Sequence, residues 1–402
     1  MHRANCISCF GQVRGNQWRQ DLKPFRCEVS DAVLVDLKTR LERTRLPDQL
    51  DGAGWDYGTE RSYLDELCAY WRDQFDWRAA EARFNRFPQF TTEIDGEHVH
   101  FYHIRSPEPN ALPLIITHGY PGSVAEFLDI LGPLSDPARH GGDPRDAFHV
   151  VAPSIPGYGF SGPTRHKGFN IAKAAAVNTR IMEMLGYDRY IAQGGDYGSA
   201  ISSQMARAHP ERVIALHLNF IVGWPADPDN PMAGLSGEEI AQQEWKRNYD
   251  LHESGYQAIQ GTKPQSLAYG LTDSPAGLAA WIVEKFRTWS DCDGDIERSF
   301  SKDHLLENIM LYWVTGTINS AMRFYYECIG PNRAPTGELS RVEVPTAHAR
   351  FPAEIRPTPR AWAEQAYNVV RWTKLPKGGH FAAFEQPELF LADLREFCRD
   401  FR

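Results

Sequence analysis

The stretch Tyr190–Ser199, which reads YIAQGGDYGS, decides how the chain folds and what chemistry it can carry. Its first three residues predict a short buried strand, and the run from Ser199 to His209 predicts a helix that ends before Pro210. Glycines before and after Asp196 allow a tight turn in which the carboxylate stands exposed. A carboxylate in that place can attack a carbon atom and form an ester with the enzyme. The alternative interpretation is an aspartate that only stabilises the N-terminus of a helix.

The composition is that of a globular protein with a large core. The 402 residues correspond to about two or three domain-sized units, and 42% of them are hydrophobic. A net charge of -9 without a basic patch argues against nucleic acid or an anionic membrane surface as a partner. No apolar run approaches the ~18 residues of a membrane-spanning helix, and Met1–Lys23 lacks the apolar stretch of a signal peptide. We therefore expect a soluble protein without a membrane anchor.

The cysteines and the metal-like motifs indicate neither a disulfide framework nor a metal site. Seven cysteines, an odd number in a long chain, fit a reduced and cytoplasmic protein. Cys6 and Cys9 form an isolated CxxC pair without the second pair of a zinc site. The histidines in 98–103 lack a third ligand in a matching pattern, and the acidic run 291–295 departs from the spacing of a calcium loop. We expect no metal and no cofactor.

Residues 1–22 are expected to be a disordered extension, and residues 23–105 to form the first folded segment. An amphipathic helix is predicted from about Ser30, because leucines recur on one of its faces. An aromatic-rich helix follows over 63–71, and its apolar side needs a partner further along the chain. Two strands within 90–104 flank the pair Asp95-Gly96 and predict a hairpin.

Residues 106–222 alternate short apolar strands with helical or loop spacers. The strands are expected at 114–116, 148–151, 190–192 and 213–220. This alternation is typical of an α/β fold, with a mostly parallel sheet covered by helices on both faces. Residues 223–332 replace it with a segment rich in helix formers, for example over Leu278–Trp289 and Leu305–Tyr326, and we interpret this segment as an inserted helical lid. The alternation returns in 333–402, with a strand at 369–372 and a closing helix over Pro387–Phe401.

Further candidate site residues follow from the turn at Asp196. In α/β-hydrolases such a turn carries the nucleophile, and an acid and a histidine follow it along the chain. Glu354 and then His380, on a Gly-Gly loop after the last predicted strand, match that order. The loop HGYPGS follows the first strand of this core, where the fold places a backbone donor, so we expect the N–H groups of Tyr120 and Tyr197 to form an oxyanion hole. An oxygen leaving group also needs a donor, for which the lid offers tyrosines.

Short motifs run through the whole chain in a fixed order. They are TRLP (44–47), GWDY (54–57), HGYP (118–121), PGYGFS (156–161), GGDYG (194–198), GYQAIQGTKP (255–264), LYW (311–313), RFY (323–325) and GGHFAAFE (378–385). Together they cover the chain from about Lys23 to the C-terminus, and they resemble the signatures of epoxide hydrolases of the microsomal type.

The resemblance implies an α/β-hydrolase core, an N-terminal segment that wraps around it, and two lid tyrosines that hold the epoxide oxygen. Matched residue by residue, these are Tyr256 and Tyr325, and Tyr325 is preferred to Tyr326 on the Arg-Phe-Tyr match alone. The chain departs from the family in two respects. The membrane anchor of the vertebrate members is absent, and Tyr197 stands where tryptophan is commoner.

The resulting hypothesis is a cofactor-independent epoxide hydrolase that acts on a small-molecule epoxide and water. Asp196 attacks the epoxide while the two lid tyrosines stabilise the departing oxygen. His380, oriented by Glu354, then activates water and releases a vicinal diol. A haloalkane-type dehalogenase would also use aspartate, but with halide-binding tryptophan or asparagine. A non-catalytic binding protein of this fold would have no need to retain all five residues. The epoxide, the carbon attacked and the formation of a homo-oligomer stay open.

Overall fold

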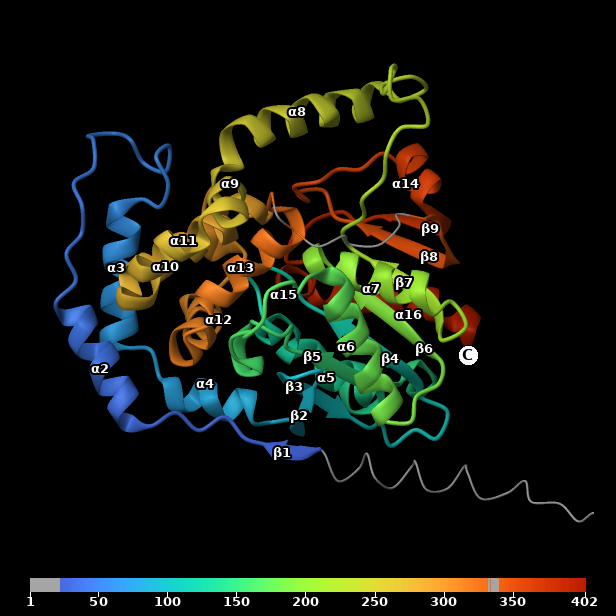
Figure 1. Cartoon of the computed structure of the whole chain (residues 1–402), viewed down its shortest axis with the longest axis horizontal. Helices are drawn as coiled ribbons and strands as arrows, with labels where there is room; N and C mark the ends of the chain where they lie inside the picture. The colour runs from blue at the N-terminus through green and yellow to red at the C-terminus, as the bar shows by residue number, and fades with distance from the viewer. Residues whose placement is uncertain (1–21, 332, 334–339) are drawn as a thin grey trace, which may run out of the picture.

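The computed structural model of the chain describes residues 22–331, 333 and 340–402. A nine-stranded sheet in the order β1-β2-β3-β5-β4-β6-β7-β8-β9 runs through the molecule (Figure 1). The strands are β1 Lys23–Phe25, β2 Gln89–Ile94, β3 Glu97–Ile104, β4 Leu112–Thr117, β5 Phe148–Pro153, β6 Tyr190–Gly194, β7 Val213–Leu218, β8 Val342–Arg350 and β9 Tyr367–Lys374. The expected extension 1–22 lies, except for residue 22, outside the described residues, and so do Cys6 and Cys9.

Pairing divides the sheet into an antiparallel edge and a parallel centre. Strands β1, β2, β3 and β5 are antiparallel neighbours, with the predicted hairpin turning at Asp95, whose φ is 53°. Strands β5, β4, β6, β7, β8 and β9 pair in parallel. Parallel strands need crossover helices, which bury both faces of the sheet. The prediction of a mostly parallel sheet is confirmed.

Helices cover both faces of this sheet. Helices α6 (Ile171–Met184) and α7 (Asp196–Ala208) pack side by side on one face, and α5 (Leu128–Ser135) and α16 (Pro387–Cys398) lie together on the other (Figure 1). Asn170 begins α6 by accepting hydrogen bonds from the N–H groups of Ala172 and Lys173. The carboxyl ends of the parallel strands point toward the lid, so residues that follow these strands can gather at one edge.

The lid is a stack of six helices between β7 and β8. They are α8 Gly237–Glu253, α9 Gly255–Thr262, α10 Pro264–Asp273, α11 Pro275–Trp289, α12 Lys302–Thr315 and α13 Ile318–Ile329. Within the helix-rich stretch Leu305–Tyr326, the chain turns at Gly316, between α12 and α13. This glycine has φ 64°, and its N–H bonds back to the last turn of α12, which ends the helix. The unit boundaries at 22, 105, 222 and 332 stay predictions.

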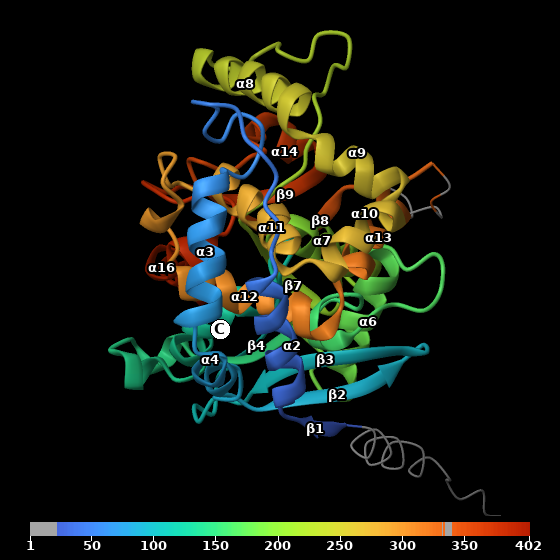
Figure 2. The same ribbon diagram turned by 90° about the vertical axis from the view of Figure 1, so that its left-hand side faces the viewer.

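The N-terminal segment lies along the outside of the lid. Strand β1 extends the antiparallel edge, and α2 (Asp31–Glu42) and α3 (Arg61–Asp73) pack against α11 (Figure 2). Helix α4 (Trp77–Phe84) then returns the chain to β2. Arg40 bonds Asp273 over 2.8 Å, and the Tyr70 hydroxyl donates to Asp303 over 2.9 Å. The apolar side of the predicted aromatic helix therefore finds its partner in the lid.

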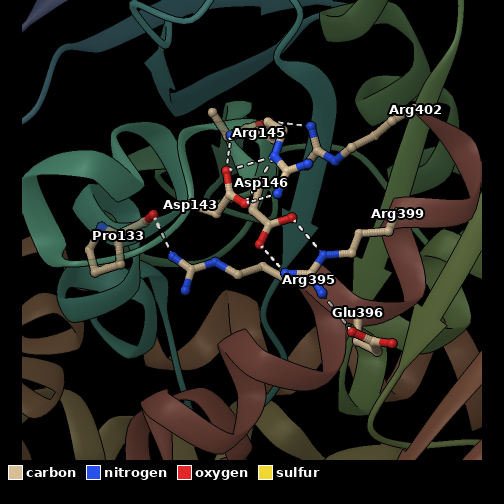
Figure 3. A network of polar contacts seen from close by, with 9 residues as sticks. Pro133, Asp143, Arg145, Asp146, Arg395, Glu396, Arg399 and Arg402 are labelled. Atoms are coloured by element: carbon tan, nitrogen blue, oxygen red, sulfur yellow. Dashed lines mark hydrogen bonds and ion pairs between the residues drawn. The ribbon is translucent and has the colours of Figure 1, made fainter.

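The C-terminus is tied to the sheet by arginines. Arg399 contacts both oxygens of Asp146, over 3.0 and 2.7 Å, and Arg395 donates to Pro133 O over 2.8 Å (Figure 3). The predicted closing helix is shorter than expected: α16 ends at Cys398, and a single 3-10 turn, Arg399–Phe401, follows. Arg399 of this turn thereby contacts Asp146, which lies just before β5.

Candidate active site

Asp196 stands at the tight turn between β6 and α7. Its φ is 48°, in the left-handed region that costs a non-glycine residue energy, and such strain is typical of functional turns. The glycines around Asp196 are needed because a side chain at these positions would overlap neighbouring atoms. A Cβ added at Gly119 would overlap the Asp196 side chain, and one at Gly198 would overlap Thr117 O. The sequence GGDYG therefore forms this turn because backbone segments approach too closely for any larger residue.

The Asp196 carboxylate has one backbone donor and one histidine beside it. The Tyr120 N–H donates to Oδ1 over 2.9 Å, and His380 Nε2 lies 3.4 Å from Oδ2. The side chain is 18% exposed, so one side of the carboxylate faces open space. Within the described chain, the Tyr197 N–H makes no hydrogen bond to this carboxylate. Of the two expected oxyanion donors, the structure brings the Tyr120 N–H into contact with Asp196.

The loop that carries Tyr120 is fastened to the lid. Tyr312 of α12 donates its hydroxyl hydrogen to Gly122 O over 2.6 Å, and Asn308 donates to Pro121 O over 2.8 Å. Trp281 of α11 donates from Nε1 to the Tyr120 hydroxyl over 2.8 Å. Because both lid helices hold it, the N–H that contacts Asp196 has a fixed direction.

His380 is held by Glu354, as the order of residues predicts. Glu354 follows β8, and its two oxygens lie 2.9 and 3.0 Å from His380 Nδ1. A carboxylate at Nδ1 fixes the tautomer, so Nδ1 carries the proton that it donates. Burial opposes a charge on His380, but Glu354 and Asp196 outweigh burial and raise the pKa of the ring well above its usual value. His380 Nε2 is buried without a well-formed hydrogen bond, which leaves it available to a reactant.

The two expected lid tyrosines face Asp196 across a cavity of about 530 Å³. Tyr256 begins α9 and Tyr325 lies on α13, with ring centroids 5.8 Å apart and both side chains buried. Burial, and then the negative charge of Asp196, raises the pKa of Tyr256. Burial, and then Tyr256 and Asp196, raises the pKa of Tyr325. Tyr325 lines the cavity, whereas Tyr326 does not.

The cavity also contains polar residues that the sequence did not reveal. Tyr249 and Lys246 come from α8, Gln257 from α9, and Arg356 from the loop that follows Glu354. Gln257 Nε2 donates to the Tyr256 hydroxyl over 2.9 Å, which orients that hydroxyl. Lys285 Nζ lies 4.7 Å from the centroid of the Tyr256 ring on its other side. Apart from Gln257, which lies in the stretch GYQAIQGTKP, none of these belongs to a motif, and their positions depend on how the lid helices pack.

Neither the rejected motifs nor the fold provides a metal centre in the described residues. His100 is buried, with its ring nitrogens 3.0 Å from Ser154 Oγ and 2.9 Å from Gln89 Oε1. The run 291–295 forms a turn in which Asp293 pairs with Arg298. Among the residues described, no group of three His, Cys, Asp or Glu side chains could hold a metal ion. In the same part of the chain, no helix has the length and apolarity needed to cross a membrane.

Comparisons with known proteins identify the family. Residues 22–127 match the family model described as epoxide hydrolase N terminus, and residues 113–237 match that of the alpha/beta hydrolase fold. Epoxide hydrolase 1 of Sus scrofa is 40% identical over 94% of this chain and 88% of its own length. The structure of juvenile hormone epoxide hydrolase from the silkworm Bombyx mori superposes with a TM-score of 0.86 at 32% identity, covering 95% of each chain.

A second solved structure supports the same relationship. Aspergillus niger epoxide hydrolase superposes with a TM-score of 0.84 at 32% identity, covering 94% of this chain and 96% of its own. Such identity and coverage include the N-terminal segment, the core and the lid. The chain belongs to the epoxide hydrolase family and has the α/β-hydrolase fold.

Proposed function

We propose that the protein opens an epoxide through an ester with Asp196 and then hydrolyses the ester to a vicinal diol. The observation that carries this proposal is the position of Asp196 between two hydrogen-bond donors for the epoxide oxygen and a base for water. Tyr256 and Tyr325 line the open cavity on one side, and His380 lies 3.4 Å from the carboxylate on the other. This arrangement separates the group that attacks carbon, the donors for oxygen and the base for water.

Ring opening is assigned to Asp196 and the two tyrosines. An oxygen of Asp196 forms a bond to one epoxide carbon, and the bond between that carbon and the epoxide oxygen breaks. Both tyrosines have raised pKa values and keep their protons at neutral pH, so each can donate a hydrogen bond to the oxygen as it becomes negative. Paired tyrosines suit an oxygen leaving group, which favours an epoxide over the alkyl halide of a dehalogenase.

The raised pKa of His380 fits the order of the two steps. In the resting enzyme the ring is protonated and pairs with the Asp196 carboxylate. Ester formation removes the charge of Asp196, which lowers the pKa of His380, so the ring releases its proton and the new alkoxide takes up one. The ring is then neutral and can take a proton from water. The Tyr120 N–H, already at Oδ1, stabilises the oxyanion that forms on the ester carbonyl.

The size of the cavity indicates the size of the substrate. A cavity of about 530 Å³ lies within the range of about 300–1,000 Å³ that is usual for small-molecule sites. Phe220, Val222, Ile329 and Ile355 supply apolar wall, while Lys246, Asp250 and Arg356 supply charge. We therefore propose an epoxide with a sizeable apolar substituent.

A cytoplasmic location is part of the proposal. Five cysteines of the described chain are free and buried, at positions 27, 68, 292, 328 and 398. Burial raises the pKa of the thiols of Cys27, Cys68 and Cys328 to about 12, which keeps them protonated and unreactive. Thiols of this kind fit a reducing compartment.

The separation of the two steps can be tested by removing the base. His380→Gln should still form the ester but should not hydrolyse it, because Asp196 and the tyrosines are intact. Intact-mass spectrometry after mixing with styrene oxide should show protein heavier by one substrate mass. Wild-type enzyme in excess of substrate should show no lasting adduct. If the variant binds substrate without gaining that mass, the roles of Asp196 and His380 are wrong.

A further inference from the structure

A second, small cavity lies behind the Asp196 carboxylate. Its volume is about 20 Å³, and the residues that line it include Asp196, His380, Glu126, Gly119 and Tyr120. One buried water molecule needs roughly 10–15 Å³ of such space and two to four polar partners. The cavity therefore has the size and the polarity to hold one water molecule beside the histidine.

The loop at this cavity is shaped around Glu126. Glu126 lies in the 3-10 turn η2 (Val124–Phe127), which follows the loop that carries Tyr120. A Cβ added at Gly122 would overlap Glu126 Oε1, so the glycine makes room for this carboxyl group. Neither the nucleophile–acid–histidine order nor the lid tyrosines give Glu126 a role.

Glu126 is held in an uncharged form beside the two reacting side chains. Burial raises its pKa to about 8; His380 acts to lower that pKa, whereas Asp196 and Glu385 act to raise it. These three face it from the loop before α15 (Ala382–Glu385), from α7 and from α15, and the buried Tyr312 of α12 is a fourth titratable group beside it. A neutral carboxylic acid has both a donor and an acceptor, so it can bind water without adding a second negative charge next to Asp196.

We propose that the carboxyl group of Glu126 holds the hydrolytic water in this cavity, between His380 Nε2 and the carboxyl carbon of Asp196. The inference rests on the proposed ester at Asp196. His380 removes one proton from the water, and the water oxygen bonds to the ester carbonyl carbon. The bond from that carbon to the diol oxygen then breaks, and the departing alkoxide takes the proton of the new Asp196 carboxyl group. Asp196 is again a carboxylate and His380 is again protonated.

The alternative is a purely structural role for Glu126, and the test must distinguish that role from binding of the hydrolytic water. Ser123 precedes η2, and its Oγ accepts from the Ala125 N–H over 3.1 Å. A glutamate three residues after such a serine commonly caps the turn through the serine N–H, and glutamine serves as well. Glu126→Gln therefore keeps a cap while it removes the acid.

The two half-reactions can be measured separately in stopped flow. Trp289, whose ring lies 5.1 Å from that of His380, supplies a fluorescence signal next to the ester. In Glu126→Ala, ester formation should stay within about twofold of wild type, whereas ester hydrolysis should slow about 10- to 100-fold, since misplaced reactants lose rate on that scale. Glu126→Gln keeps a neutral donor and acceptor, so it should hydrolyse the ester at close to the wild-type rate. The pH profile of the hydrolysis step should also lose one ionisation. Glu126→Asp, which keeps an acid but withdraws it from the water, should slow the same step.

Glu307→Gln is the matched control. Glu307 of α12 is also a buried carboxyl group whose pKa burial raises to about 7, but it lies beside Arg83, at 3.2 Å. It should leave both rate constants unchanged. Wild-type hydrolysis in Glu126→Ala and Glu126→Asp, or equal slowing of both steps, would overturn the role of Glu126. Absence of any ester phase in the wild-type enzyme would instead overturn the proposed function.

Discussion

Two histidine–carboxylate pairs of the described chain are almost completely buried, and they differ in what faces the second ring nitrogen. His217 lies with Nε2 3.1 Å from Asp393 Oδ2, and its Nδ1 has no hydrogen-bond partner. His380 binds Glu354 through Nδ1 and faces the Asp196 carboxylate, at 3.4 Å, with Nε2. The first pair joins β7 to α16, and the second joins the loops that follow β8 and β9.

The carboxylates differ as much as the histidines. Asp393 Oδ1 also accepts hydrogen bonds from Arg371, over 2.9 Å, and from Thr373, over 2.7 Å, so its charge is fully used in holding the structure. Glu354 accepts one further bond, from the Arg356 N–H over 3.2 Å. A buried histidine–carboxylate pair is therefore not by itself a sign of catalysis. The nucleophile and the open space at the other nitrogen make the difference.

Removing the acid from each pair should give the largest contrast. Glu354→Gln should reduce kcat by roughly 10³- to 10⁴-fold, because the histidine loses the partner that fixes its tautomer and stabilises its charge. Asp393→Asn should lower the free energy of unfolding by about 2–3 kcal/mol, because Arg371 and His217 lose a buried partner. Its kcat per folded molecule should stay near that of wild type. Steady-state kinetics and urea unfolding of both variants measure these effects. A loss of kcat in Asp393→Asn would show that the His217–Asp393 pair is not purely structural.

The lid tyrosines should show a smaller effect, confined to ring opening. Tyr256→Phe or Tyr325→Phe should each slow ester formation by about 1–3 kcal/mol in activation free energy, the scale of a hydrogen bond to a developing charge. The double variant should nearly abolish ester formation. Tyr326→Phe is the neighbouring control, and single-turnover rates should stay at the wild-type value. A slow Tyr326→Phe beside a normal Tyr325→Phe would reverse the assignment.

The smallest effects should appear as opposite pH dependences of stability. The pKa of His380 is raised, because Glu354 and Asp196 outweigh burial. The contribution of His380 to stability is therefore complete below about pH 6.5 and is lost as the pH rises through the raised pKa. The pKa of Asp393 would be raised by burial, but His217, Thr373 and Arg371 lower it. Its contribution is therefore complete above about 3.9 and is lost as pH falls.

Urea unfolding across pH measures both contributions. The difference in unfolding free energy between wild type and His380→Gln should shrink at alkaline pH. The difference between wild type and Asp393→Asn should shrink below about pH 4. Two differences that move in the same direction would show that the charges of one pair have been assigned wrongly.

The sequence predicted the parts of the fold that depend on local patterns. The hairpin at Asp95-Gly96, the turn at Asp196 and the central strands follow from residues adjacent in the chain, and the structure confirms them. Strand β8 was missed because charged residues and Pro345 interrupt its apolar pattern, and its pairing with β9 shifts register there. The division of the lid into separate helices could not be predicted, because the break between α12 and α13 depends on the backbone of a single glycine, Gly316.

Some site residues could likewise be predicted from the sequence, and others could not. The order of nucleophile, acid and histidine in α/β-hydrolases indicated Asp196, Glu354 and His380, and matched motifs indicated the lid tyrosines. Glu126 and Lys246 could not be proposed from the sequence. The burial of Glu126 beside Asp196 and the position of Lys246 on the cavity wall depend on how the lid packs on the core. His217 shows the converse, since nothing in the sequence marks it as one of a buried pair.

In the proposed reaction Asp196, and not water, attacks the epoxide. A single turnover with enzyme in excess, run in oxygen-18 water, distinguishes these two nucleophiles. In the covalent route the new diol oxygen comes from the Asp196 carboxylate, and water replaces that oxygen when the ester is hydrolysed. The first diol should therefore be mostly unlabelled, and the label should appear in the peptide that contains Asp196. A first diol that carries the label quantitatively, with none in that peptide, would contradict the account.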